Sequence, residues 1–137
     1  MRVNTLFIPV EKFSLGRKDR ELIDKIIKKN TSRAAGLLKL RIKILTVTLH
    51  PHWWGGGGAA ESKEWLRLKL PMRWRSSSHR AFYLKKELPA TIYHEIHHLA
   101  RRDVYSPEKD YPKQALINAL INEGLAELFS EEQVSNY

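Results

Sequence analysis

The feature that most constrains the fold of this chain is a pair of histidines four residues apart, His94 and His98, in a segment with a helical pattern. Residues four apart lie on one face of an α-helix, one turn from each other. Both imidazoles can therefore bind one metal ion. Glu95 lies about 100° further around the helix, so it can reach a water on that ion but is poorly placed to bind the ion itself. The alternative is a solvated face that carries two histidines by chance.

The helix that bears these histidines is expected over Pro89–Arg102, with proline in its first turn. Its apolar residues fall on the side opposite the two histidines: Ile92, Ile96, Leu99 and Ala100. This pattern predicts a helix that packs on the core with one side and presents the histidine pair on the other. His97 is expected beside the site or on the surface, and not as a ligand.

A second helix is expected over Pro112–Ser130. It is apolar almost all round, which predicts burial. A carboxylate in its middle, Glu123, is costly unless it is paired or bound to a metal, and Glu127 lies one turn away on the same face. A zinc ion resolves both problems if Glu123 is its third ligand and Glu127 accepts the N–H of a ligand histidine. Gly124 would then allow close approach of the two helices. The alternative is an exposed edge on which the glutamates pair with Arg101, Arg102 or Lys113.

The residues before these helices predict a sheet with one backing helix. Strands are expected over Val3–Val10, Leu40–Leu49, Trp65–Leu70 and Ala81–Leu84, and a helix over Arg17–Leu38. Strict alternation makes Trp65–Leu70 a half-buried strand, and Pro9 favours an edge position for the first strand. The expected fold is therefore α+β, with a small mixed or antiparallel sheet packed on helices. We expect one domain over residues 1–137, divided into residues 1–88 and residues 89–137.

Four consecutive glycines stand in the segment His50–Ala60. A run of glycine disfavours a helix and lets another backbone approach closely. The segment is expected to be a surface loop or, alternatively, an edge that faces a substrate. Trp53 and Trp54 beside it are expected to pack in the core.

Composition narrows the classes of function. The chain has no cysteine, which excludes disulfides, cysteine nucleophiles and thiolate metal sites. No apolar run is long enough to span a membrane, and the first ten residues lack a secretory pattern, so a cytoplasmic protein with no membrane partner is expected.

The formal net charge of +9 is unevenly distributed, with +8 over residues 1–50, +5 over residues 51–92 and −4 over residues 93–137. Basic regions of this kind suit solvated surfaces, acidic substrates or nucleic acid. A basic nucleic-acid-binding or regulatory domain with a structural or vestigial metal site is therefore the alternative function. No recognised nucleic-acid-binding motif supports it.

Two stretches together resemble a known family. The stretch Leu88–Arg102 (LPATIYHEIHHLARR) and the stretch Ile121–Phe129 (INEGLAELF) are similar to the gluzincin-type metallopeptidases, and in particular to uncharacterised predicted zinc-dependent proteases with a His-Glu-x-His-His helix and a Glu-Gly-Leu-Ala-Glu helix. The resemblance implies a zincin-like fold and hydrolysis of peptide bonds in a peptide or protein substrate, endopeptidase more than exopeptidase, with one Zn²⁺ per chain.

By the same resemblance, His94, His98 and Glu123 are the metal ligands, Glu95 is the general base, and Glu127 orients a ligand histidine. The edge around Gly55–Leu70 would bind an extended peptide by β-addition. Larger gluzincins continue with a subdomain that supplies an oxyanion donor, whereas only ten residues follow Glu127 here. The candidates for that role in this chain are Tyr105, Tyr111, His79 and Arg101.

Overall fold

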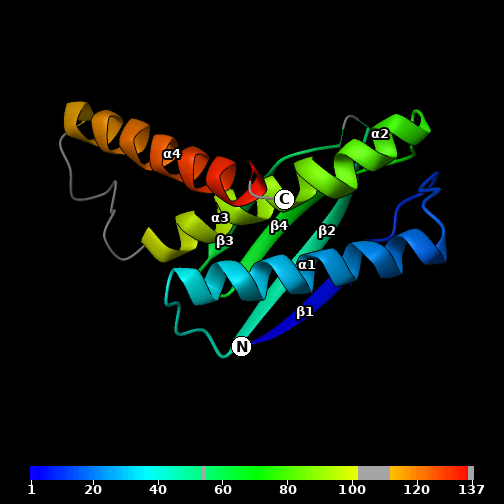
Figure 1. The fold of residues 1–137 in the computed structure, drawn as a ribbon, viewed down its shortest axis with the longest axis horizontal. Coiled ribbons are helices and arrows are strands. Elements are labelled where there is room, and N and C mark those ends of the chain that lie inside the picture. The colour runs from blue at the N-terminus through cyan, green and yellow to red at the C-terminus, as the bar shows by residue number, and fades with distance from the viewer. Residues whose placement is uncertain (54, 102–111, 136–137) are drawn as a thin grey trace.

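The computed structural model describes residues 1–53, 55–101 and 112–135, and it confirms the α+β class (Figure 1). Its elements in chain order are β1 (Arg2–Phe7), α1 (Arg17–Leu37), β2 (Ile44–His52), β3 (Gly58–Ser62), β4 (Trp65–Pro71), α2 (Ser77–Phe82), the π-helical turn η1 (Tyr83–Glu87), α3 (Leu88–Arg101) and α4 (Pro112–Ser135). Within the described residues, no helix combines the length and the apolar character that crossing a membrane requires.

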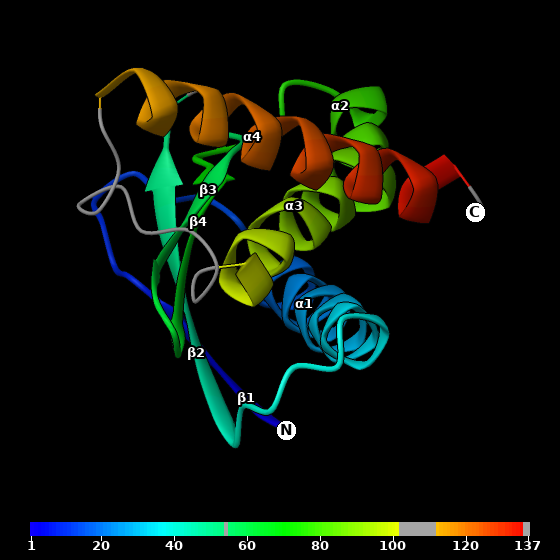
Figure 2. The same ribbon diagram turned by 90° about the vertical axis from the view of Figure 1, so that its left-hand side faces the viewer.

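The four strands form one mixed sheet in the order β1-β2-β4-β3. Strands β1, β2 and β4 are parallel, whereas β3 runs antiparallel to β4. Figure 2 shows α1 and α3 on the same face of this sheet, with α4 crossing over α3. Strand β1 is therefore one edge of the sheet and β3 the other, and it is β3 that packs beside α3.

The core fills the space between the sheet and the helices α1 and α3. Alternate residues of the central strands and the inner faces of both helices are fully buried: Leu45, Val47, Leu49, Leu66, Leu68, Leu70, Ile23, Ile27, Ile92 and Ile96. The alternation expected for Trp65–Leu70 is confirmed, because Trp65 lies on the opposite, exposed face. The apolar side expected for the histidine-bearing helix is confirmed as well. Each such aliphatic side chain stabilises the fold by about 1.5–3 kcal/mol, so α3 is firmly anchored to the sheet.

Two of the expected strands differ from the structure. The strand expected from Leu40 begins only at Ile44, because its parallel partner β1 starts at Arg2, which pairs with Ile44. The strand expected over Ala81–Leu84 is wrong, since α2, η1 and α3 form a continuous helical rod from residue 77 to residue 101. A short apolar run is compatible with either a strand or a helix. The decisive signal is Ser76, whose Oγ accepts the N–H of His79 at 3.0 Å and caps α2.

Helix α4 is longer than expected and much less buried. Its outward apolar side chains are exposed: Leu116, Ile117, Leu120, Ile121, Leu125 and Leu128. The expected burial of Glu123 and Glu127 is also wrong, because their side chains are 63% and 64% exposed. The helix touches α3 with only one side, so its apolar composition overstates its burial. Gly124 has no atom within 4 Å of a Cβ placed on it, so it serves no close helix approach.

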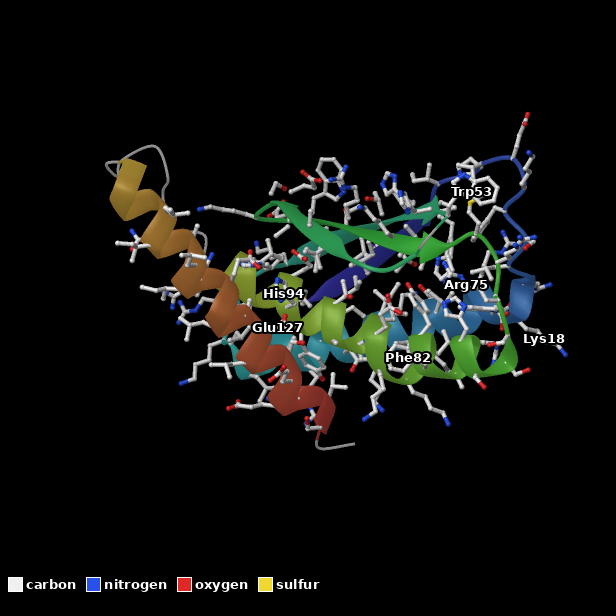
Figure 3. The ribbon with its side chains drawn as sticks, turned by 90° about the horizontal axis from the view of Figure 1, so that it is seen from above. Lys18, Trp53, Arg75, Phe82, His94 and Glu127 are labelled. Atoms are coloured by element: carbon white, nitrogen blue, oxygen red, sulfur yellow. The ribbon has the colours of Figure 1, made fainter. Side chains whose placement is uncertain are left out.

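The tryptophan pair also departs from expectation. Trp53 is 62% exposed at the turn after β2, and it does not pack in the core. Figure 3 shows it well away from His94, toward one end of the molecule. Trp54 lies outside the described residues.

The helix α1 is tied to the start of the helical rod through Asp19. Its carboxylate accepts hydrogen bonds from Arg80 Nη2 at 2.7 Å and from Trp74 Nε1 at 2.6 Å. The hydrogen bond from Arg80 and then that from Trp74 lower the pKa of Asp19 below its usual value of 3.8, against the opposing effect of burial. The contact therefore stabilises the fold while Asp19 is ionised.

We predict that Asp19→Asn lowers the midpoint of thermal unfolding at pH 7. Because the folded-state pKa of Asp19 is below 3.8, its contribution is fully present above pH 3.8 and is lost as the pH falls through the lower folded value. The difference in stability between wild type and variant, measured by thermal denaturation followed by circular dichroism, should therefore disappear in acid. Glu21→Gln, which breaks only an exposed pair with Arg17, is the control and should change little. A difference independent of pH would contradict this account.

Candidate metal centre

Three side chains from two helices converge where α4 crosses α3. His94 and His98 project from α3, and their Nε2 atoms lie 3.0 Å apart. Glu123 of α4 places one carboxylate oxygen 3.2 Å from His94 Nε2 and the other 2.9 Å from His98 Nε2. One donor atom from each residue lies within 4.8 Å of the others. Figure 3 shows His94 and Glu127 on the facing sides of these two helices.

The spacing of these donors fits a tetrahedral zinc site. Zinc–nitrogen and zinc–oxygen bonds of about 2.0–2.1 Å place neighbouring ligand atoms about 3.3 Å apart in a tetrahedron. The two Nε2 atoms lie 3.0 Å apart, and different oxygens of Glu123 lie 3.2 Å from His94 Nε2 and 2.9 Å from His98 Nε2, all close to that value. Two imidazole nitrogens and a carboxylate are also a ligand set that catalytic zinc sites use, with the fourth position left for water.

The other ring nitrogens of both histidines face α4. His94 Nδ1 lies 3.3 Å from Glu127 Oε2, so this carboxylate is placed to pair with a proton on Nδ1. With Nδ1 protonated, the lone pair of Nε2 points toward Glu123. Such a hydrogen bond fixes the tautomer that a metal requires.

His98 has an equivalent neighbour that the sequence analysis did not identify. His98 Nδ1 lies 3.2 Å from the side-chain nitrogen of Asn122, while Asn122 Oδ1 is buried without a partner. A half turn of the amide places Oδ1 where it accepts the N–H of His98 Nδ1, which leaves His98 Nε2 free for a metal. The signal was present in the sequence, since Asn122 directly precedes Glu123.

Glu95 lies between the metal centre and the edge strand β3. It is 7% exposed, and its carboxylate accepts the backbone N–H of Ala60. Burial raises the pKa of Glu95, and the nearby His94 and the N–H of Ala60 partly offset this effect. A Cβ on Gly58 would lie 3.0 Å from Glu95 Cγ and 2.9 Å from the backbone oxygen of Arg67. Glycine at position 58 therefore allows β3 to approach α3 closely.

Open space flanks His94 and Glu95 on both sides. One cavity of about 430 Å³ is lined by Gly58, Ala59, Ala60, His94, Glu95, His98, Ala119, Asn122 and Glu123. A second cavity of about 310 Å³ is lined by Gly57, Gly58, Glu87, Ala90, Thr91, His94, Glu95, Glu127 and Ser130. The metal centre is thus accessible from two directions along β3.

The remaining sequence candidates do not join this arrangement in the described part of the chain. His79 lies 15 residues before His94 on the same helical rod, which corresponds to about 20 Å. Its Nδ1 accepts the N–H of Arg75, and neither it nor Arg101 lines the two cavities. Tyr105 and Tyr111 lie outside the described residues. His97, expected at the surface or beside the site, is instead buried against Phe129.

Comparison with known proteins agrees with this geometry. A family model described as "Predicted Zn-dependent protease (DUF2268)" matches residues 77–136. The matched segment begins at α2 and includes α3 and α4, so it contains all three converging side chains and Glu95, but none of the sheet. No curated protein and no solved structure matches the chain. The match supports a family of zinc-dependent proteases.

We predict that Gly58→Ala destabilises the protein by about 1–3 kcal/mol, because its Cβ would overpack the contact between β3 and Glu95. Gly124→Ala is the matched control on the exposed helix α4, because the added methyl group would contact no other atom there. It should stabilise the protein by about 0.5–1 kcal/mol, since alanine favours a helix interior over glycine. Urea denaturation measures both changes. Equal effects of the two substitutions would argue against a close contact at Gly58.

Proposed function

We propose that the protein is a zinc-dependent metallopeptidase. The observation that carries the proposal is the convergence of His94, His98 and Glu123 beside a buried carboxylate, in a site open on both sides. His94, His98 and Glu123 would hold the ion. The family match over the same helices supports the assignment.

When bound, zinc supplies a Lewis acid that polarises the peptide carbonyl and lowers the pKa of water to about 7. The carboxylate of Glu95 accepts the proton of the attacking water and later delivers it to the leaving amine. The N–H of Ala60 holds Glu95 in place, since it donates to that carboxylate. Glu127 and Asn122 orient the two ligand histidines through their Nδ1 atoms.

The substrate would bind along the free edge of β3. Lys69 N–H donates to Gly57 O at 2.9 Å, so Gly57 uses its carbonyl toward β4. In an antiparallel ladder successive residues alternate between the two sides, which turns the backbone groups of Gly58 toward the free edge. An extended peptide can add to the sheet there, next to Glu95. Cavities on both sides of His94 leave room for chain before and after the scissile bond, which favours an endopeptidase.

We predict that Glu95→Gln retains zinc but loses peptidase activity, because the neutral amide cannot accept the proton of water and the ligands are untouched. Zinc content by mass spectrometry of the metal and cleavage of a fluorogenic peptide library measure the two properties. His94→Ala should lose both, and it should lower the midpoint of thermal unfolding because the ion links α3 to α4. Wild-type protein without stoichiometric zinc would contradict the proposal. Salt-sensitive binding to nucleic acid without peptide cleavage would favour a nucleic-acid-binding domain instead.

We further predict that Asn122→Leu weakens zinc binding by about 10–100-fold, because His98 loses the acceptor that fixes its tautomer. Asn122→Asp keeps an oxygen at that position and should bind zinc nearly as well as wild type. Competition with a chromophoric chelator measures the affinities, and Gln133→Leu on the same helix serves as control. Equal affinities for all four proteins would show that Asn122 does not orient His98.

A further inference from the structure

The cavity lined by Glu87 and Glu127 is not explained by the metal centre itself. It shares His94 and Glu95 with that centre and extends away from it between α3 and α4. We infer that this cavity binds the side chain of a lysine or arginine next to the scissile bond of a peptide substrate. The inference rests on the proposed peptidase function and specifies which substrates the site accepts.

The charged residues that line the cavity favour a cation. Besides Glu95, the lining contains Glu87 and Glu127, and no lysine or arginine from the described part of the chain belongs to it. Glu127 contacts His94 through one oxygen and leaves the other available. The cavity continues into a groove that shares Glu87 and Glu127 and adds Glu131. The lysine that lines this groove, Lys86, donates to Val134 O at 3.2 Å.

Ser130 adds a hydroxyl group to the wall of the cavity. Ser130 is 3% exposed and lines both the cavity and the groove. An ammonium or guanidinium group in the cavity would donate a hydrogen bond to this oxygen.

The cavity has the size and walls that a long cationic side chain needs. Its volume of about 310 Å³ and that of the adjoining groove, about 300 Å³, leave room for an extended lysine or arginine. Ala90 and Thr91 present small apolar groups at its wall. Methylene groups of a lysine or arginine can pack on such a surface while the charged end reaches the carboxylates.

The glycine run belongs to this cavity. A Cβ on Gly56 would clash with Oε1 of Glu87, so the carboxylate lies directly against the loop. Residues 55–57 all have positive φ, between 64° and 81°, a conformation that favours glycine. The loop therefore holds Glu87 at the rim of the cavity. This accounts for the consecutive glycines, which the sequence alone left as either a loop or a substrate-facing edge.

A preference for a basic substrate side chain is the opposite of what the net charge of the chain alone suggests. A total charge of +9 favours acidic substrates. Charges beyond a Debye length of about 10 Å are largely screened, however, whereas carboxylates within contact distance act at full strength. The local carboxylates therefore decide the preference at this position.

The strand β3 also sets the position of the cation in the substrate. A peptide that pairs antiparallel to β3 runs toward Gly58 and continues past the cavity. The cavity then receives the residue on the carboxyl side of the scissile bond. We therefore expect cleavage before lysine or arginine.

The test measures binding separately from catalysis. Zinc-loaded Glu95→Gln protein is titrated with fluorescent peptides that carry Lys, Gln or Glu at one position, and fluorescence anisotropy gives the Kd values. The Lys peptide should bind at least tenfold tighter than the Glu peptide, and the preference should fall with added salt. Adding Glu87→Gln should reduce the preference about tenfold, and Glu87→Lys should reverse it. Glu64→Gln, an equal charge change on an exposed residue near β3, should leave it unchanged.

Cleavage of a peptide library by zinc-loaded protein with native Glu95 then identifies the position. Cleavage before Lys or Arg supports the inference as stated. Cleavage mainly after Lys or Arg, or equal cleavage at all side chains, overturns it. Equal binding of all three peptides, or a preference that Glu87→Lys leaves intact, overturns it as well. In those cases retained zinc and cleavage still support the peptidase, whereas protein without zinc or cleavage contradicts the proposed function itself.

Discussion

The arrangement of the C-terminal half depends on the convergence of two imidazoles and a carboxylate at separations of 2.9–3.2 Å. If Nδ1 of each histidine carries its proton and pairs with Glu127 or with the turned amide of Asn122, the Nε2 lone pairs and the carboxylate oxygens all point to one place. Without a cation these lone pairs repel one another. A divalent ion bound there would convert the repulsion into three bonds and would join α3 to α4.

The fold holds the two histidines of α3 more firmly than it holds Glu123 of α4. Helix α3 is fixed to the sheet by Ile92 and Ile96, which are fully buried, and its position relative to α1 is reinforced through Asp19 and Arg80 at the start of the rod. Helix α4 rests on α3 through a narrow strip that includes Ala126 and Phe129, while its outer face is exposed. The histidines are thus preorganised, whereas the position of Glu123 would depend more strongly on a bound ion. The metal would therefore contribute to folding as well as to chemistry.

Sequence reasoning identified the converging residues because helical periodicity of four is a local property. The spacing of His94 and His98 requires no knowledge of the tertiary structure. The burial of Glu123 was inferred incorrectly, because composition does not reveal how much of an apolar helix meets a partner. The short strand β3 was missed for a related reason. Gly58 and Ala60 carry no β-propensity, and their extended conformation comes from pairing with β4 and from the contact of Ala60 with Glu95. Asn122 shows a further limit, since its role depends on which way its side-chain amide turns toward His98.

The uneven charge along the chain has a structural explanation in this site. Residues 93–137 carry a formal net charge of −4, although the whole chain carries +9. Glu95, Glu123 and Glu127 of that third surround the metal centre, and Glu131 continues the series along α4 into the adjoining groove. Glu87 contributes a further carboxylate from the helix turn before α3. Carboxylates gathered this closely repel one another, which costs stability unless cations neutralise them. A zinc ion would compensate those at the ligand end, and a cationic substrate side chain would compensate those at the far end. The same repulsion would therefore favour both metal binding and the choice of a basic substrate.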